Sequence, residues 1–248
     1  MTLRSILLII ALLSVMAKPA FAERITVAVA SNFLTTAQDI VAVFSAKTGH
    51  EVDLVHGSTG KLFAQIRAGA PFDVFLSADQ ARPARLRDTG LVPDDGVLTY
   101  AVGRLALVHG PRTQPGDLVE ILLRPGLRFA IADPAVAPYG IAARDVLRDQ
   151  LGDSWRANVV FGESVGQAFA FVATGNAEAG LVALGQARTF DGEIWVLELP
   201  EARHKPILQD AALLMRANDN EAARAFFEFL RSDFARAIVE DAGYGAAQ

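Results

Sequence analysis

The chain has 248 residues, of which 52% are hydrophobic and 21% are charged. This composition is typical of a globular protein with one large or two modest domains, and it excludes an intrinsically disordered chain. The sequence has no cysteine, which excludes disulfides, thiol catalysis and cysteine-based metal sites. The formal net charge is −5 and the lysines and arginines are not clustered, which argues against nucleic-acid binding.

The first 22 residues have the pattern of an export signal. Arg4 precedes a short apolar run from Ile6 to Val15, and Ala20-Phe21-Ala22 fits a small-x-small cleavage site. The run is shorter than the ~20 apolar residues that a membrane-spanning helix needs. No cysteine follows it, which excludes a lipoprotein anchor. We therefore expect residues 1–22 to be a signal peptide, cleaved after Ala22, that directs the protein to the periplasm.

The next part of the chain alternates β-rich runs with amphipathic helical stretches. Apolar spacing predicts three strands and three helices in alternation, a series typical of a parallel sheet covered by helices. The predicted strands are residues 25–30, 52–55 and 73–76, and the predicted helices are residues 34–47, 61–68 and 82–89.

One long strand over residues 100–109 is predicted to cross into a second lobe, where the alternation repeats. Residues 206–215 are a second candidate crossing strand, followed by helices at the end of the chain. The second lobe is predicted to hold strands 127–132, 158–161, 179–183 and 194–197 and helices 141–151 and 165–173, and the final helices are 221–230 and 234–240. The sequence thus predicts an α/β fold with a signal peptide (1–22), lobe 1 (23–102 plus 208–248) and lobe 2 (103–207).

Four predicted strand-to-helix turns, two in each lobe, are rich in small and polar residues. Helix N-termini bind anions, because their first N–H groups are unpaired and carry a partial positive charge. Serine, threonine and asparagine add short side-chain donors, and glycine lets the backbone approach a ligand closely. If all four turns face one cleft, they can hold a dianion without lysine or arginine. The turns are residues 30–33 (ASNF), 56–60 (HGSTG), 137–140 (APYG) and 162–166 (GESVG).

A purely structural interpretation of each turn is also available. Serine, threonine and asparagine are the preferred N-caps of helices in general, so one such turn is weak support for a ligand. Tyr139 follows Pro138, and an aromatic residue in that position often only packs. It is the occurrence of all four turns in one exported, two-lobe chain that favours an anion site.

These segments, in this order, resemble the molybdate-binding proteins of bacterial ABC transporters. The most specific stretches are GSTGKL and GAPFDVFLSAD, and the similarity runs from Ile25 to Tyr244. The resemblance implies a two-lobe periplasmic-binding-protein-like fold, in which each lobe is a mixed, mainly parallel sheet flanked by helices and two crossing strands form the hinge. It also implies high-affinity binding of molybdate, and of tungstate, for delivery to the membrane permease of an ABC importer. No catalysis, no cofactor, no metal beyond that of the oxyanion and a monomeric state are expected.

The resemblance also implies the ligand-binding residues. Some members of the family add a tyrosine hydroxyl at the position of Ala183, which this chain lacks. The expected ligands are Ser31 and Asn32 in the first turn, Thr59 with Ser58 beside it in the second, and the backbone N–H groups of Tyr139 and Val165 in the third and fourth.

Glu163 is the one carboxylate within the four turns. Molybdate, tungstate and sulfate are fully deprotonated near neutral pH and need only donors, so a carboxylate in the pocket would repel them. We therefore expect Glu163 to point away from the ligand. If it reached the ligand, a protonated phosphate would be favoured. His56, next to the second turn, is expected to have a surface or capping role.

Three alternatives remain open at the level of sequence. A binder of another tetrahedral oxyanion, such as sulfate or thiosulfate, would use the same donors. A secreted serine hydrolase is possible because GESVG fits the Gly-x-Ser-x-Gly elbow, with Ser164 as nucleophile and Asp191 and His204 following in the required order. A sensor lobe that feeds a membrane receptor could use the same fold.

Overall fold

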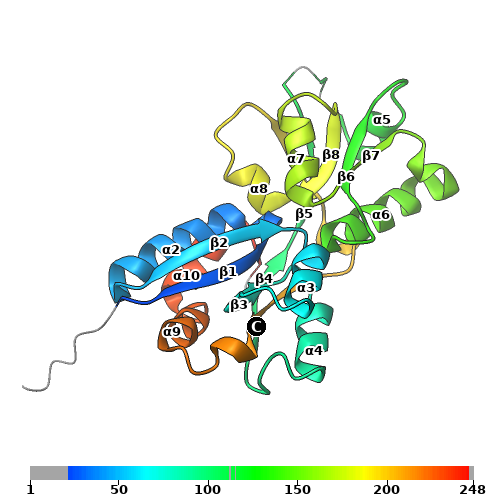
Figure 1. The fold of residues 1–248 in the computed structure, drawn as a ribbon. Coiled ribbons are helices and arrows are strands. Elements are labelled where there is room, and N and C mark those ends of the chain that lie inside the picture. Colours follow the sequence, from blue (N-terminus) through cyan, green and yellow to red (C-terminus); the bar gives the residue numbers. More distant parts are fainter. Residues whose placement is uncertain (1–21, 112, 115, 246–248) are drawn as a thin grey trace, which may run out of the picture.

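The computed structural model describes residues 22–111, 113, 114 and 116–245. It has two lobes, and the N-terminal and C-terminal segments share one of them (Figure 1). The sheet of this lobe, lobe 1, has the strand order β2-β1-β3-β10-β4. Strands β1, β2 and β3 are parallel, and β10 runs antiparallel to β3 and β4. The strands are β1 (Arg24–Ala30), β2 (Glu51–Gly57), β3 (Val74–Leu76), β4 (Val97–Gly103) and β10 (Ile207–Leu213).

The middle of the chain forms lobe 2, whose sheet has the order β7-β6-β8-β5-β9. Strands β6, β7 and β8 are parallel, and β5 runs antiparallel to β8 and β9. The strands are β5 (Leu105–His109), β6 (Phe129–Ala132), β7 (Val159–Gly162), β8 (Ala179–Ala183) and β9 (Trp195–Glu198). Two mixed, mainly parallel sheets flanked by helices confirm the predicted fold class.

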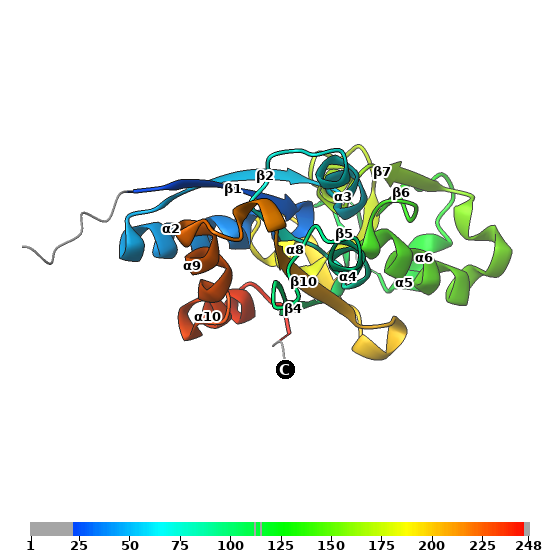
Figure 2. The same cartoon turned by 60° about the horizontal axis from the view of Figure 1, so that its bottom comes forward.

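Helices cover both faces of the lobe 1 sheet, because side chains alternate along each strand. Ile25, Val27 and Val29 of β1 pack in a core with α2 (Leu34–Thr48), α9 (Glu221–Phe229) and α10 (Asp233–Asp241). Figure 2 shows these three helices gathered on one side of β1. Ala28 belongs to a separate core with α3 (Thr59–Arg67) and α4 (Ala81–Asp88). Burial on both faces explains why β1 is almost continuously apolar.

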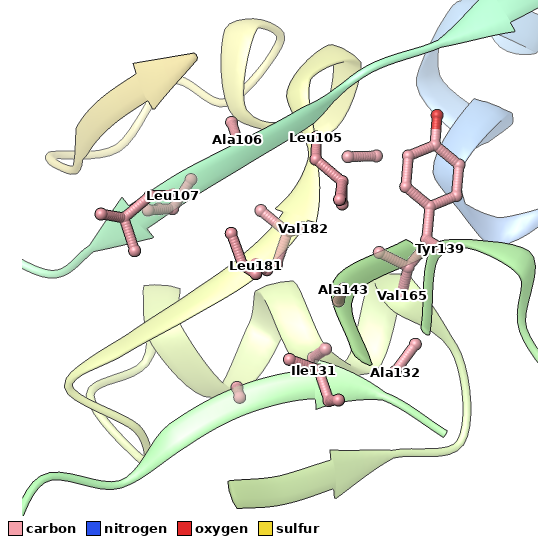
Figure 3. Packing of buried hydrophobic residues seen from close by; sticks show 14 of the residues in the cluster. Leu105, Ala106, Leu107, Ile131, Ala132, Tyr139, Ala143, Val165, Leu181 and Val182 are labelled. Atoms are coloured by element: carbon pink, nitrogen blue, oxygen red, sulfur yellow. The ribbon is translucent and has the colours of Figure 1, made fainter. Parts of the chain in front are cut away.

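The described residues of lobe 2 form one hydrophobic core around its sheet. Leu107, Ile131, Leu181 and Val182 from three neighbouring strands meet there (Figure 3). The helices described in this lobe are α5 (Leu118–Leu122), α6 (Pro138–Leu151), α7 (Val165–Ala173) and α8 (Leu184–Arg188). The 3-10 segments within the described residues are η1 (Ser31–Phe33), η2 (Gly152–Arg156), η3 (Glu201–Arg203) and η4 (Met215–Ala217).

The single strand predicted over residues 100–109 is wrong. The chain forms two strands, β4 and β5, which belong to different sheets and are separated by Arg104. A continuous strand cannot pair in two sheets at once, so the hydrogen-bond ladder changes partners at this residue. Arg104 forms ion pairs with Glu198 at the end of β9 and with Glu201 on the second connection between the lobes.

Two helices begin two or three residues earlier than predicted, and both differences concern the cleft between the lobes. Helix α6 begins at Pro138 rather than at residue 141, because proline is well tolerated in a first turn. Helix α3 begins at Thr59 rather than at residue 61. The short helices α5 and α8 were not predicted. Of the predicted signal peptide, residues 1–21 lie outside the described residues. No helix of the described ranges combines the length and apolar character needed to cross a membrane.

Candidate functional site

A small cavity of about 10 Å³ lies between the two lobes. Its wall contains all six residues predicted to bind the ligand and no Asp, Glu, Lys, Arg or His among the described residues. Lobe 1 contributes Ala30, Ser31, Asn32, Gly57, Ser58, Thr59 and Ala78, and lobe 2 contributes Ala137, Pro138, Tyr139 and Val165. The polarity of the cavity therefore comes from hydroxyl groups, one amide side chain and the backbone.

The cavity lies where helices begin. Thr59 and Val165 are the first residues of α3 and α7, Tyr139 is the second residue of α6, and Ser31 begins the 3-10 turn that leads into α2. Amides in a first helical turn have no intrahelical carbonyl to bind and carry a partial positive charge. Four helical starts thus lie around one small space.

Two first-turn amides instead bind the opposite lobe. The Gly60 N–H donates to the Val136 carbonyl at 2.9 Å, and the Gly166 N–H donates to Ser31 Oγ at 3.1 Å. Gln186 Nε2 adds a third bond between the lobes, to the Ser31 carbonyl at 3.1 Å. These bonds hold the lobes closed around the cavity.

Three hydroxyl groups in the wall are oriented by backbone amides. Ser31 Oγ accepts from Gly166, Ser58 Oγ accepts the Lys61 N–H at 3.3 Å, and Thr59 Oγ1 accepts the Ala78 N–H at 3.2 Å. Each oxygen is thereby fixed as an acceptor, so its own proton remains to be donated. The hydroxyls add three donors to those of the backbone.

Asn32 lines the cavity, but its side chain is directed into lobe 1. Its Nδ2 donates to Gln209 Oε1 at 2.8 Å and lies 3.4 Å from the Tyr244 hydroxyl. The Tyr244 hydroxyl in turn donates to the Asn32 carbonyl. The Asn32 side chain is therefore partly occupied with positioning its own turn. Sequence reasoning missed Gln209, which has no local signal, whereas Tyr244 lies in the AGYG stretch that carries the resemblance.

The buried tyrosines near the cavity stay protonated. Burial raises the pKa of Tyr139 and Tyr100 well above the usual value, and it also raises the pKa of Tyr244. A neutral phenol can donate a hydrogen bond and does not repel an anion. Ala183 is buried at the end of β8 and is not part of the cavity wall.

Glu163, within the fourth turn, and Lys61, directly after the second turn, pair with each other outside the cavity. Lys61 forms an ion pair with Glu163 across the cleft, and both side chains are at least half exposed. Glu163 therefore points away from the cavity, as predicted from its charge. His56 is exposed and is not in the cavity wall.

Removing this ion pair should change anion affinity only slightly. Exposed pairs contribute roughly 0.2–1 kcal/mol, so we expect Lys61→Met to weaken binding by no more than about fivefold, and less at high salt. Calorimetric titration at two salt concentrations measures this, and Glu163→Gln should give a change of the same size. A loss above about tenfold for Lys61→Met alone would place this cation in the site.

The residues of the hydrolase alternative do not form a triad. Ser164 Oγ caps α7 by accepting the Gln167 N–H at 3.2 Å, and the His204 ring is bonded to the Lys205 carbonyl. No hydrogen bond among the described residues joins Ser164, Asp191 and His204, although a triad requires that geometry. Nor do the described residues contain a group of three or more His, Cys, Asp or Glu side chains placed to hold a metal ion.

The chain is similar to bacterial binding proteins over nearly its whole length. The family described as "Bacterial extracellular solute-binding protein" matches residues 25–245, which include every residue of the cavity wall. The molybdate-binding protein ModA of Rhodobacter capsulatus is 40% identical over 98% of this chain and 96% of its own length. ModA of Azotobacter vinelandii is 39% identical over 90% of each chain.

The three-dimensional similarity has the same extent. The solved structure of the Azotobacter vinelandii periplasmic molybdate-binding protein matches with a TM-score of 0.82 at 34% identity, and the match covers 90% of this chain and 100% of that chain. The likeness therefore includes both lobes and the cleft between them.

Proposed function

Because the chain belongs to the family of bacterial extracellular solute-binding proteins, and within it to the molybdate-binding proteins, we propose that it captures molybdate, and also tungstate, for an ABC importer. The observation that carries the proposal is the cavity between the lobes, where helix N-termini and hydroxyl groups supply donors and the described residues of the wall include no carboxylate or cationic side chain. The proposed ligands are the hydroxyls of Ser31, Ser58 and Thr59 and the first-turn amides of Asn32, Tyr139 and Val165.

The chemistry of the wall suits a fully deprotonated anion. Hydrogen bonds to a charged group contribute on the order of 1.5–3 kcal/mol each, so several of them can bind a small dianion tightly after ordering costs. A protonated phosphate would also need an acceptor such as a carboxylate, and Glu163 is turned towards Lys61 instead. Molybdate, tungstate and sulfate are all fully deprotonated and fit this wall equally, and similarity to the molybdate-binding ModA proteins favours molybdate.

Binding requires the lobes to move. A cavity of about 10 Å³ is close to the smallest that can hold one water molecule, so an ion of five heavy atoms needs the walls to move apart. We propose that the lobes open at the two connections between the sheets, admit the ion and close on it by hinge motion. No bond is made or broken in this cycle.

The proposed partner is the membrane permease of the importer, which would recognise the closed, loaded form. The proposed location is the periplasm, reached by export and by cleavage of the signal peptide after Ala22, and the proposed working form is a monomer. No cofactor takes part beyond the metal of the oxyanion itself.

Calorimetric titration of the purified mature protein with molybdate, tungstate, sulfate and phosphate tests the proposal. We expect tight binding of the two larger anions and at least about a hundredfold weaker binding of the other two, equivalent to roughly 2.7 kcal/mol. Tight binding of sulfate with no response to molybdate would replace the proposal by the sulfate alternative. Hydrolysis of an ester that Ser164→Ala abolishes would establish the enzyme instead.

A further inference from the structure

Three buried polar atoms behind the cavity have no hydrogen-bond partner among the described residues: Asn32 Oδ1, the Tyr139 hydroxyl and Gln209 Nε2. They come from three parts of the fold that meet at the hinge. Asn32 belongs to lobe 1, Tyr139 to the start of α6 in lobe 2, and Gln209 to β10, the lobe 1 strand that follows the second connection between the lobes. Buried polar groups are nearly always paired, so three orphaned atoms in one place need an explanation.

The three side chains are neighbours. Asn32 Nδ2 already donates to Gln209 Oε1 at 2.8 Å. The Tyr139 hydroxyl and Gln209 Nε2 both pack against Gly103, where an added Cβ would lie 2.2 Å from the hydroxyl and 3.1 Å from the nitrogen. Figure 3 shows the Tyr139 ring with its hydroxyl lying beside the blue N-terminal segment of lobe 1.

Their hydrogen-bonding capacities are complementary. A carboxamide oxygen only accepts, a carboxamide nitrogen only donates, and a phenol hydroxyl does both. The Tyr139 hydroxyl can therefore accept from Gln209 Nε2 and donate to Asn32 Oδ1 at the same time. A small shift of α6 relative to lobe 1 would complete this chain of bonds and leave none of the three atoms unpaired.

We propose that Gln209 is a positioning residue for the oxyanion site, which it serves through a buried relay that joins the side chains of Asn32, Gln209 and Tyr139 when the lobes close on the ion. This inference rests on the proposed function. Asn32 and Tyr139 also line the cavity, so a relay behind the wall holds the amides of their two turns at the distance that the anion requires. The relay stabilises the loaded, closed form and slows release of the ion.

A double-mutant cycle tests the relay. Tyr139→Phe removes only the hydroxyl and keeps the ring and the backbone amide, and Gln209→Met keeps the side-chain length without polar atoms. We expect each to weaken molybdate binding by roughly 5- to 150-fold, the range for a buried hydrogen-bonding group that loses its partner, and the double variant to lose clearly less than the product of the two single losses. Most of the loss of affinity should come from a faster dissociation rate, which stopped-flow tryptophan fluorescence measures.

The control is Thr99→Val. It removes the hydrogen bond from Thr99 Oγ1 to Asp210 Oδ1 at 2.7 Å, one residue along β10 from Gln209 and outside the relay. This variant should lose some stability in urea but keep its affinity within about twofold, because the bond lies within lobe 1.

The outcomes separate the two proposals. Independent, multiplicative losses for Tyr139→Phe and Gln209→Met, or an unchanged affinity for Tyr139→Phe, would overturn the relay while leaving oxyanion binding in place. If Gln209→Met lowered only the stability in urea and left the dissociation rate of the ion unchanged, the role of Gln209 would be structural only. Failure of the wild-type protein to bind any of the four oxyanions would overturn the proposed function, and the positioning role with it.

Discussion

Replacing Gly60 by alanine is expected to prevent full closure of the lobes. The added Cβ would lie 2.8 Å from the Val136 carbonyl oxygen and 3.1 Å from Val136 Cα, which are backbone atoms of the opposite lobe. Neither can move without displacing the turn that leads into α6. Overpacking of this kind costs about 1–3 kcal/mol, so we expect molybdate affinity to fall by roughly 5- to 150-fold.

The stability of the ligand-free protein should change little in this variant, because alanine is the better helix former. When the lobes are apart, the one close contact left to the added Cβ is 3.2 Å to Arg82 Nη2, the far end of a flexible side chain. Calorimetry measures the affinity, and small-angle scattering with saturating ligand measures whether the variant stays more open than the wild type. Gly110→Ala is the matched control, since its added Cβ makes only an ordinary contact of 3.5 Å with the Val172 carbonyl. Equal affinities for Gly60→Ala and the wild type would show that the closed arrangement is not the binding form.

The second large effect is expected for Ser31→Ala. This hydroxyl accepts the Gly166 N–H from the opposite lobe and has its own proton available to the cavity. The substitution removes both a donor to the anion and a bond between the lobes. Since a hydrogen bond to a charged group is worth about 1.5–3 kcal/mol, we expect a 10- to 150-fold loss of molybdate affinity by calorimetry.

Ser164→Ala is the matched control for Ser31→Ala. Ser164 Oγ also accepts a backbone N–H, that of Gln167, but the residue is not part of the cavity wall. Loss of this N-cap should lower the free energy of unfolding by about 1 kcal/mol and leave the affinity unchanged. If the two variants lost affinity equally, the proposed role of Ser31 as a ligand would be rejected.

Local sequence pattern was sufficient for most of the secondary structure. Residues 165–173 and 179–183 were predicted with the boundaries that α7 and β8 have. Helical periodicity and glycine stops are local signals, and in these two segments no long-range contact overrides them. The failures occurred where local signals are weak. Five-residue helices such as α5 and α8 are too short to show a period, and residues 100–109 remain apolar across the break at Arg104.

The turns that form the cavity wall could also be predicted from the sequence. An anion site made of helix N-termini needs small polar residues directly after strands, and that requirement is visible within a few consecutive residues. The pattern indicated the four turns, and the resemblance implied the six ligand residues within them, which do line one cavity. Their function as ligands stays a prediction, to be tested by the substitutions of Ser31 and Gly60.

The sequence by itself determined the alternation of strands and helices, the four anion-suited turns and the exclusion of cysteine chemistry, because each depends on composition or on neighbouring residues. Only the tertiary structure decided which turns meet, that Glu163 pairs with Lys61 away from the cavity, and that Asn32 faces Gln209. Asn32 and Gln209 are 177 positions apart in the chain. Contacts over such separations depend on how two independently formed sheets are joined at the hinge, and no local pattern encodes that arrangement.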